Sequence, residues 1–291
     1  MLVRCIAKTG RMLPRPLGIA LFGGIGYLVF FFPNEEKRRT LRHLRFIYGD
    51  EWDARRITHT AHQVYVNLGK NLFDALWLSQ APNRQFFEIV HYDSFESVRR
   101  AYDNGNGVII ITAHIGCFEM LLQLFGRMGC KSFAIGQEAY DRRIDDIISN
   151  ARRGENIDYM HRKENPREII RRLNQGQVLG VLIDQDTRVE GIHAPFLGKL
   201  ANTPSGPIKM AMRFNIPAFV ATTARQKDGT HRVYISEPLP LQESGGKDDL
   251  LNNVTAANDI ISEAIRRDPE QWVWMHRRWK RKPPEKKTGK L

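Results

Sequence analysis

Residues 107–119 read GVIIITAHIGCFE, and this stretch decides the fold. The apolar, β-forming run at 108–111 predicts a buried strand. Gly116 predicts a tight turn, and the amphipathic run at 118–128 predicts a helix that follows it. A buried strand, a turn and a helix in succession indicate an α/β protein.

Two side chains in this stretch suit catalysis. His114 and Glu119 are five positions apart, so on one regular helix they would lie about 140° apart and could not meet. They can meet if His114 ends the strand, Gly116 turns the chain and Glu119 lies in the first helical turn. The helix dipole favours an ionised Glu119 at that position, and a carboxylate that orients an imidazole supports its action as a general base.

This pair contains no nucleophile of its own, so it suits direct attack by a hydroxyl group of a substrate. Backbone N–H groups near Gly116 are candidates for holding the oxyanion that would develop. The alternative is that His114 is an ordinary surface or core histidine. Its place at the carboxyl end of a strand favours a functional role, because ligand sites of open α/β sheets lie there.

The remaining sequence alternates between strand and helix patterns, which predicts an α/β fold with a mixed, mostly parallel central sheet flanked by helices. Further strands are expected at 86–90, 131–136, 178–184 and 218–224, with 231–236 as an edge strand. Helices are expected at 35–48, 53–79, 94–103, 141–153, 166–174 and 248–267. Thr203-Pro204 predicts one more helix start, which is either an anion site or a plain cap, and 193–198 is expected to be a loop.

The buried strand at 178–184 ends in acidic residues. Asp184 and Asp186 could suggest a metal pair, but only Gln185 and the distant Glu190 are available to complete a ligand set. The three cysteines show no Cys-x-x-Cys spacing. We therefore expect no metal, no cofactor and a reducing compartment.

The charge of the chain indicates an anionic partner. The 291 residues have a formal net charge of +12 and a pI of about 9.8, which favours nucleic acid, an acidic protein or anionic lipid. No zinc-ligand spacing or RNP-like strand is present, so we expect no nucleic-acid partner. The arginines of the expected helix at 141–153, Arg152 among them, form either a solvated face or a phosphate clamp.

The two ends of the chain have membrane-like features. Residues 17–32 are sixteen uncharged residues that include four glycines, which is shorter than the roughly 20 that a spanning helix needs. We expect segment 1–32 to lie in a membrane interface or to pack on the domain at 33–282, followed by a basic tail at 283–291. Residues 271–282 combine tryptophans with cations, which suits either a membrane interface or a closed core beside solvated charges.

The stretch His-Ile-Gly-Cys-Phe-Glu at 114–119 resembles the His-x4-Glu signature of the bacterial lipid A biosynthesis (late) acyltransferases, within the lysophospholipid/glycerolipid acyltransferase superfamily. The resemblance runs from about residue 33 to 280 and includes the motifs at 184–186, 195–198 and 269–279. Members commonly have Asn and Trp where this chain has Cys117 and Phe118, so the lining of the site is altered.

The resemblance implies an O-acyltransferase at the cytoplasmic face of the bacterial inner membrane, with His114 and Glu119 as its catalytic residues. The implied donor is acyl carrier protein, whose acidity suits the +12 charge, although acyl-CoA stays open as a donor. The implied acceptor is a hydroxyl of a lipid A precursor, in lipopolysaccharide biosynthesis. With the residue patterns, this gives the following substrate-binding candidates: Gly116, Cys117, Arg152, Asp184, Gln185, Arg188 and Phe196.

Two other functions fit the same sequence. One is acyl transfer to a lysophospholipid or another glycolipid. The other is a non-enzymatic, basic protein that binds membranes or nucleic acid, whose binding would be salt-sensitive and independent of His114.

Overall fold

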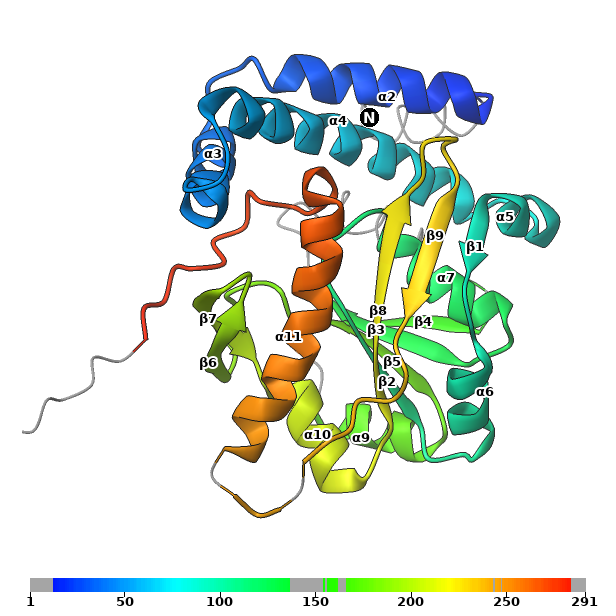
Figure 1. Cartoon of the computed structure of the whole chain (residues 1–291). Helices are drawn as coiled ribbons and strands as arrows, with labels where there is room; N and C mark the ends of the chain where they lie inside the picture. The colour runs from blue at the N-terminus through cyan, green and yellow to red at the C-terminus, as the bar shows by residue number, and fades with distance from the viewer. Residues whose placement is uncertain are drawn as a thin grey trace, which may run out of the picture.

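The structure is a computed structural model that describes residues 13–136, 154, 156–161, 166–242, 244–246 and 248–283. Within these residues the central sheet has seven strands in the order β1-β9-β8-β2-β5-β3-β4 (Figure 1). Neighbouring strands are parallel except β8 and β9, which confirms the mixed, mostly parallel sheet. The strands are β1 (Val90–Tyr92), β2 (Val108–Thr112), β3 (Ser132–Gly136), β4 (Ile157–His161), β5 (Val178–Leu182), β8 (Ala218–Arg225) and β9 (His231–Ile235).

Helices cover both faces of this sheet (Figure 1). Alternate residues of the central strand β2 point to opposite faces, as the pleat of a strand requires. Ile109 and Ile111 pack in a core with α10 and α11, whereas Val108 and Ile110 pack in a second core with α5, α6 and α7. The helices are α2 (Arg15–Val29), α3 (Glu35–Tyr48), α4 (Ala54–Leu78), α5 (Asn83–Ile89), α6 (Glu96–Asp103), α7 (Glu119–Arg127), α9 (Pro166–Asn174), α10 (Gly206–Phe214) and α11 (Asp249–Arg267).

The N-terminal helix α2 packs along α4 at one end of the molecule (Figure 1). Glycines allow the two backbones to approach closely, because a Cβ atom on Gly69 would lie 2.1 Å from the carbonyl oxygen of Phe22. A Cβ atom on Gly26 would lie 2.2 Å from the carbonyl oxygen of Tyr65. In the described part of the chain no helix has both the length and the apolar character needed to cross a membrane. Gly18, Gly23 and Gly26 of this segment face α4, whereas a Cβ atom on Gly24 would meet nothing within 4 Å.

Several expected elements are confirmed and several are wrong. The expected helices at 35–48 and 166–174 are present, the helix at 248–267 is present from Asp249, and the strand expected at 178–184 is present as β5, which ends at Leu182. Residues 86–90 were expected to form a strand, but 83–89 are the helix α5 and the strand β1 begins only at Val90. Strand β9 is not at the edge, because the short strand β1 pairs with its free side. The expected helix at 141–153 lies outside the described residues.

The segment that follows β5 also differs from the expectation. Residues 193–198 were expected to be a loop, but they belong to a hairpin of β6 (Gly191–Phe196) and β7 (Lys199–Pro204). Thr203 and Pro204 therefore end a strand, and the helix begins at Gly206, with Pro207 in its first turn. The Thr-Pro pattern predicted a helix start two residues early, with Thr203 as N-cap instead of Ser205, and the proline of the first turn is Pro207.

Candidate active site

His114 lies two residues beyond the end of β2 and is held by a buried carboxylate. Its Nδ1 atom lies 2.8 Å from Oδ1 of Asp184, and its backbone N–H donates to Oδ2 of the same side chain at 2.8 Å. The indole Nε1–H of Trp272 also donates to Oδ2, at 2.8 Å. Thr112 and Leu182 are paired in the parallel register of β2 and β5, so His114 and Asp184 each stand two residues past that pair.

The electrostatic environment keeps Asp184 ionised. Its side chain is fully buried, and burial alone would raise its pKa. The neighbouring His114 and the hydrogen bonds from His114 and Trp272 outweigh this effect and hold the pKa of Asp184 well below its usual value. A carboxylate is only an acceptor, so Nδ1 of His114 carries the proton and Nε2 of the neutral ring has the free lone pair.

Gln185 and His276 flank the same imidazole. The amide nitrogen of Gln185 lies 2.9 Å from Nε2 and 3.2 Å from Nδ1 of His114, so it sits over the face of the ring and not in its plane. The same amide nitrogen lies 2.7 Å from Nε2 of His276. Because Gln185 lies over the face, it leaves the in-plane lone pair of His114 Nε2 uncovered.

His276 is a neutral acceptor in this arrangement. Its ring centroid lies 4.7 Å from that of His114, with Phe118 at 4.8 Å from His114 as well. Burial and the nearby His114 lower the pKa of His276 to about 4. The neutral Nε2 of His276 accepts a hydrogen bond from Gln185 and fixes the position of the amide over His114.

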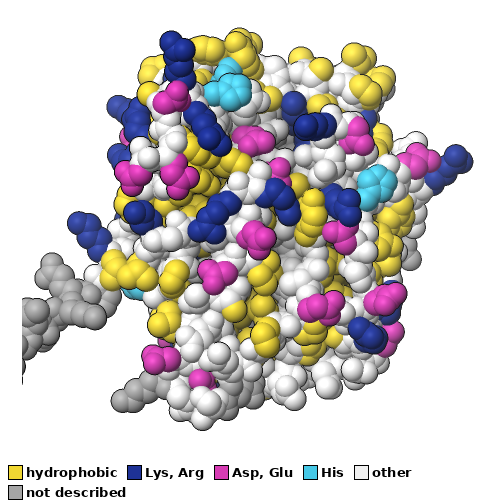
Figure 2. All heavy atoms as spheres, viewed as in Figure 1, with side chains coloured by type: hydrophobic (Ala, Val, Ile, Leu, Met, Phe, Trp, Pro, Cys, Tyr) yellow, Lys and Arg dark blue, Asp and Glu magenta, His cyan; other side chains and the backbone are white. Residues whose placement is uncertain are grey.

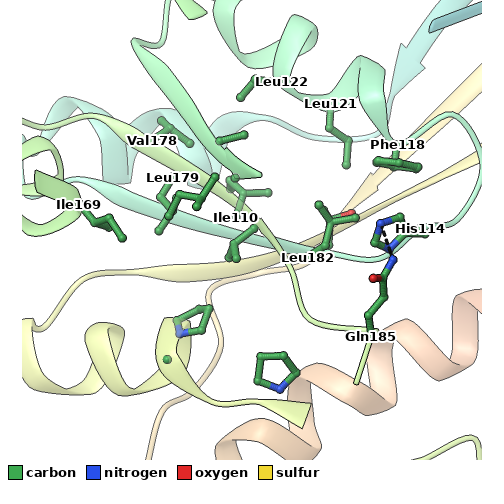
Figure 3. A pocket seen from close by; sticks show the side chains of 18 of the residues that line it. Ile110, His114, Phe118, Leu121, Leu122, Ile169, Val178, Leu179, Leu182 and Gln185 are labelled. Carbon is green, nitrogen blue, oxygen red and sulfur yellow. Dashed lines mark hydrogen bonds between the residues drawn. The ribbon is translucent and has the colours of Figure 1, made fainter. Parts of the chain in front are cut away.

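His114 faces an apolar cavity of about 670 Å³. Figure 3 shows His114, Gln185 and Phe118 at one end of this cavity and Ile169, Val178 and Leu179 at the other. Strands β2 and β5 and helix α7 supply much of the lining, which includes Ile110, Leu121, Leu122, Phe125, Gly180 and Leu182. The site therefore joins an oriented imidazole to a space of the size and apolar character that suit a hydrocarbon chain.

Glu119 lines the same cavity as His114 and begins the helix α7. The sequence spacing predicts that Glu119 orients His114. In the structure the carboxylate on Nδ1 is Asp184. The sequence offered one signal for this contact, because a polar residue follows each of the two buried strands, His114 after β2 and Asp184 after β5.

Gly116 has the conformation that the turn requires but not the availability of its amide. Its φ is +58°, and a Cβ atom there would lie 2.3 Å from the carbonyl oxygen of Thr223, so only glycine fits. Its N–H donates to the carbonyl oxygen of Gln271 at 2.9 Å. This particular amide is therefore occupied and does not serve as an oxyanion donor in this arrangement.

The other candidates from the sequence are dispersed. Cys117 is buried outside the cavity lining, near the carbonyl oxygen of Asn71, and burial raises the pKa of its thiol. Phe196 is fully buried in the core against Trp272. Arg188 is exposed and does not line the cavity, and Arg152 lies outside the described residues.

The tryptophans of the C-terminal segment mainly close the core. Trp272 and Trp274 are fully buried, and Trp279 is partly buried. This decides between the two readings of residues 271–282 for those two rings. The sequence did not single out His276, because nothing in its spacing relates it to His114.

The fold and the site define an α/β protein that presents an oriented histidine, at the rim of its sheet, to an apolar cavity. The chain belongs to the bacterial lipid A biosynthesis acyltransferase family, whose model matches residues 1–281. It is 27% identical over 207 residues to a lipid A biosynthesis palmitoleoyltransferase of Escherichia coli K12, which covers 69% of this chain and 63% of that protein. A lipid A biosynthesis acyltransferase of Shigella flexneri matches equally, and a lauroyltransferase of Escherichia coli K12 is 22% identical over 93% of this chain and 88% of its own length.

Proposed function

We propose that this protein transfers a fatty-acyl chain from the thioester of acyl carrier protein to a hydroxyl group of a lipid A precursor. The observation that carries the proposal is an imidazole that is oriented by Asp184 at the end of a long apolar cavity. Membership of the family supplies the substrate class. The formal net charge of +12 supports the acidic carrier protein as the donor.

The reaction then needs one base and no covalent enzyme intermediate. Nε2 of His114 takes the proton of the acceptor hydroxyl while that oxygen attacks the thioester carbonyl carbon. When the tetrahedral intermediate collapses, the carbon–sulfur bond breaks and the thiolate takes the proton back from His114. General-base assistance of this kind contributes about 10²–10⁴ in rate.

Two carboxylates support His114 in this scheme. Asp184 accepts the Nδ1–H and stabilises the imidazolium that forms during the reaction. Glu119 begins helix α7 and lines the same cavity as His114, and in this scheme it is the second acidic group of the site. The acyl chain occupies the apolar cavity, with its carbonyl carbon at the end lined by His114.

Helix α2 supports a peripheral association with the membrane. Its outward side exposes Leu17, Leu21 and Leu28, which are 60%, 53% and 61% accessible. Figure 2 shows apolar side chains along the edge of the molecule where α2 lies. An exposed apolar helix face of this kind suits burial in a membrane interface. We place the protein at the cytoplasmic face of the inner membrane, where acyl carrier protein is available.

The test is a transfer assay of the purified full chain with acyl carrier protein that carries a defined fatty acid. The acceptor panel contains a lipid A precursor, a lysophospholipid and another glycolipid. We expect transfer to the lipid A precursor and a loss of about 10²-fold or more in His114→Ala. Transfer to a lysophospholipid alone would show that the proposed acceptor is wrong. Full activity of His114→Ala would show that His114 is not the general base.

A further inference from the structure

A second hollow, separate from the apolar cavity, lies between helix α3 and the C-terminal segment. Its volume is about 320 Å³. It is lined by Arg39 and Arg42 from α3 and by Arg277 and Lys280 from the C-terminal segment that follows α11. Glu35 is the acidic residue of the lining. We call this hollow the α3 basic pocket. Figure 2 shows basic side chains gathered over the region of α3.

The positive charge of the α3 basic pocket is not neutralised by the described part of the chain. Glu35 is shared among Arg38, Arg39 and Arg42 at 3.4, 3.6 and 3.3 Å. The side chains of Arg277 and Lys280 have no hydrogen-bond or ion-pair partner among the described residues. Four cations therefore face one carboxylate, which leaves the pocket suited to a second anion.

Two features show that the pocket is shaped and not a chance gathering of surface charges. Arg39 is only 8% exposed, and its guanidinium is fixed by a 2.8 Å hydrogen bond to the carbonyl oxygen of Met275. His43, also in the lining, has its Nδ1 atom 2.9 Å from the carbonyl oxygen of Trp274. Burial lowers the pKa of His43, and the positive fields of Arg42 and Arg39 lower it further.

The surroundings of the pocket indicate where its anion comes from. Helix α3 begins three residues after Phe32, which is 65% exposed at the end of the apolar α2 segment. Phe46, on the same helix α3, is 48% exposed. A pocket lined by three arginines, with exposed apolar side chains on α3 and just before it, matches a lipid, whose phosphate lies beside its hydrocarbon chains.

The pocket is also connected to the candidate active site. The carbonyl groups that hold Arg39 and His43 belong to Met275 and Trp274, the two residues before His276. The ring of His276 in turn contacts that of His114. A head group held in the pocket would thus lie on the far side of the short segment that supports the base.

We propose that the α3 basic pocket binds the phosphate of a membrane-lipid head group, and that in the transfer reaction this lipid is the acceptor. The second half of this proposal rests on the proposed function. The first half does not, because it concerns binding alone. Guanidinium groups bind phosphate oxygens in pairs, and Arg277 and Lys280 are the two cations that remain available for it.

The test measures binding of the full chain to vesicles of a neutral, phosphate-free galactolipid that contain phosphatidic acid. A second set of vesicles has the same surface charge, supplied by the carboxylate of cholesteryl hemisuccinate. We expect the wild type to prefer the phosphate vesicles, and inorganic phosphate to compete better than chloride at equal ionic strength. Competition by free phosphate in the absence of a vesicle preference would identify the source as a soluble phosphate and overturn the lipid assignment.

The matched variants separate the pocket from general attraction. Arg277→Ala with Lys280→Ala should weaken binding to phosphate vesicles about tenfold, the effect of losing one or two charged hydrogen bonds. Arg213→Ala with Lys227→Ala removes the same charge from exposed positions elsewhere and should change binding less than about twofold. Equal losses in both pairs would overturn the proposal. Thermal melting checks that both pairs fold.

The transfer assay then tests the second half of the proposal. If the lipid in the pocket is the acceptor, the pocket variants raise KM for that acceptor and not for acyl carrier protein. Weakened vesicle binding with an unchanged KM for the acceptor would support a phosphate site that docks the protein on the membrane. It would contradict the proposal that the bound lipid is the acceptor. Normal transfer with unchanged vesicle binding would contradict phosphate binding in the α3 basic pocket and would not affect the proposed function.

Discussion

At the scale of single residues, the main question is which carboxylate supports His114. Asn in place of Asp184 keeps the shape of the side chain but permits the wrong tautomer of the ring, so we expect kcat to fall by about 10²–10⁴ with a smaller change in KM. Glu119→Gln should cost less, because Asp184 still holds Nδ1. Thermal melting checks that both variants fold. A larger loss of kcat in Glu119→Gln than in Asp184→Asn would mean that Glu119, and not Asp184, orients His114.

His276 is the second residue whose role is defined by one atom. Its Nε2 accepts from Gln185, which lies over the ring of His114, so we expect His276→Leu to lower kcat about tenfold by freeing that amide. His276→Gln carries an oxygen at a similar reach and should restore most of the rate. KM for the acyl donor should stay constant in both variants. If Gln and Leu behave alike, His276 only fills space.

At the scale of elements, we expect β5 to limit how far an acyl chain can extend into the cavity. Gly180 lines the cavity between Leu179 and Val181, and a Cβ atom there would meet its nearest neighbour, Leu122, at an ordinary 3.8 Å. Gly180→Leu should therefore fit locally, fill part of the cavity and shift the preferred donor to shorter acyl chains. Competition among acyl carrier proteins with a series of chain lengths measures this shift. Gly24→Leu, on the open side of α2, is the control glycine.

How far the sequence predicts this site can be seen in the strands that form it. The apolar runs of β2 and β5 are visible in the sequence, because both read as continuous hydrophobic stretches; β2 is buried along its whole length and β5 at Val178 and Leu179. Their register is not visible in sequence, so the contact between His114 and Asp184 emerges only when Thr112 is found opposite Leu182. Local spacing instead favoured Glu119, which is near in sequence but lies in a separate element.

The wrong predictions of secondary structure also arise because tertiary contacts are not visible in the sequence. Residues 86–90 have the composition of a strand, yet the tertiary structure continues the helix α5 to Ile89 and leaves three residues to pair with β9. His276 could not be predicted for the site, because it arrives from a C-terminal segment that crosses back to the end of β2. That crossing is fixed by backbone contacts, such as the N–H of Val273 with the carbonyl oxygen of His114 at 3.1 Å.

At the scale of the whole molecule, one buried carboxylate ties the N-terminal helix to the sheet. Asp74 of α4 is fully buried and accepts from Arg15 of α2, Arg225 of β8 and His231 of β9, at 2.7–2.9 Å. Burial would raise the pKa of Asp74, but the hydrogen bonds from His231 and Arg15 and the charge of Arg225 hold it well below its ordinary value of 3.8. The folded protein therefore favours the ionised form of Asp74.

This depressed pKa determines how stability should respond to acid. A carboxylate whose pKa is lower in the folded state stabilises the protein above the unfolded pKa, and this contribution is lost as the pH falls below it toward the folded pKa. Asp74→Asn leaves two arginines buried beside an amide, so we expect a loss of about 3–5 kcal/mol in the free energy of unfolding at pH 7. The difference in the free energy of unfolding between wild type and variant should narrow below the ordinary pKa of 3.8.

Denaturant unfolding across pH measures both the loss at pH 7 and its narrowing in acid. The control is the exposed pair Arg84 and Glu88, where Glu88→Gln should change the free energy of unfolding by less than about 1 kcal/mol. A gap that stays constant from neutral to acid pH would mean that Asp74 is held by packing and not by its charge.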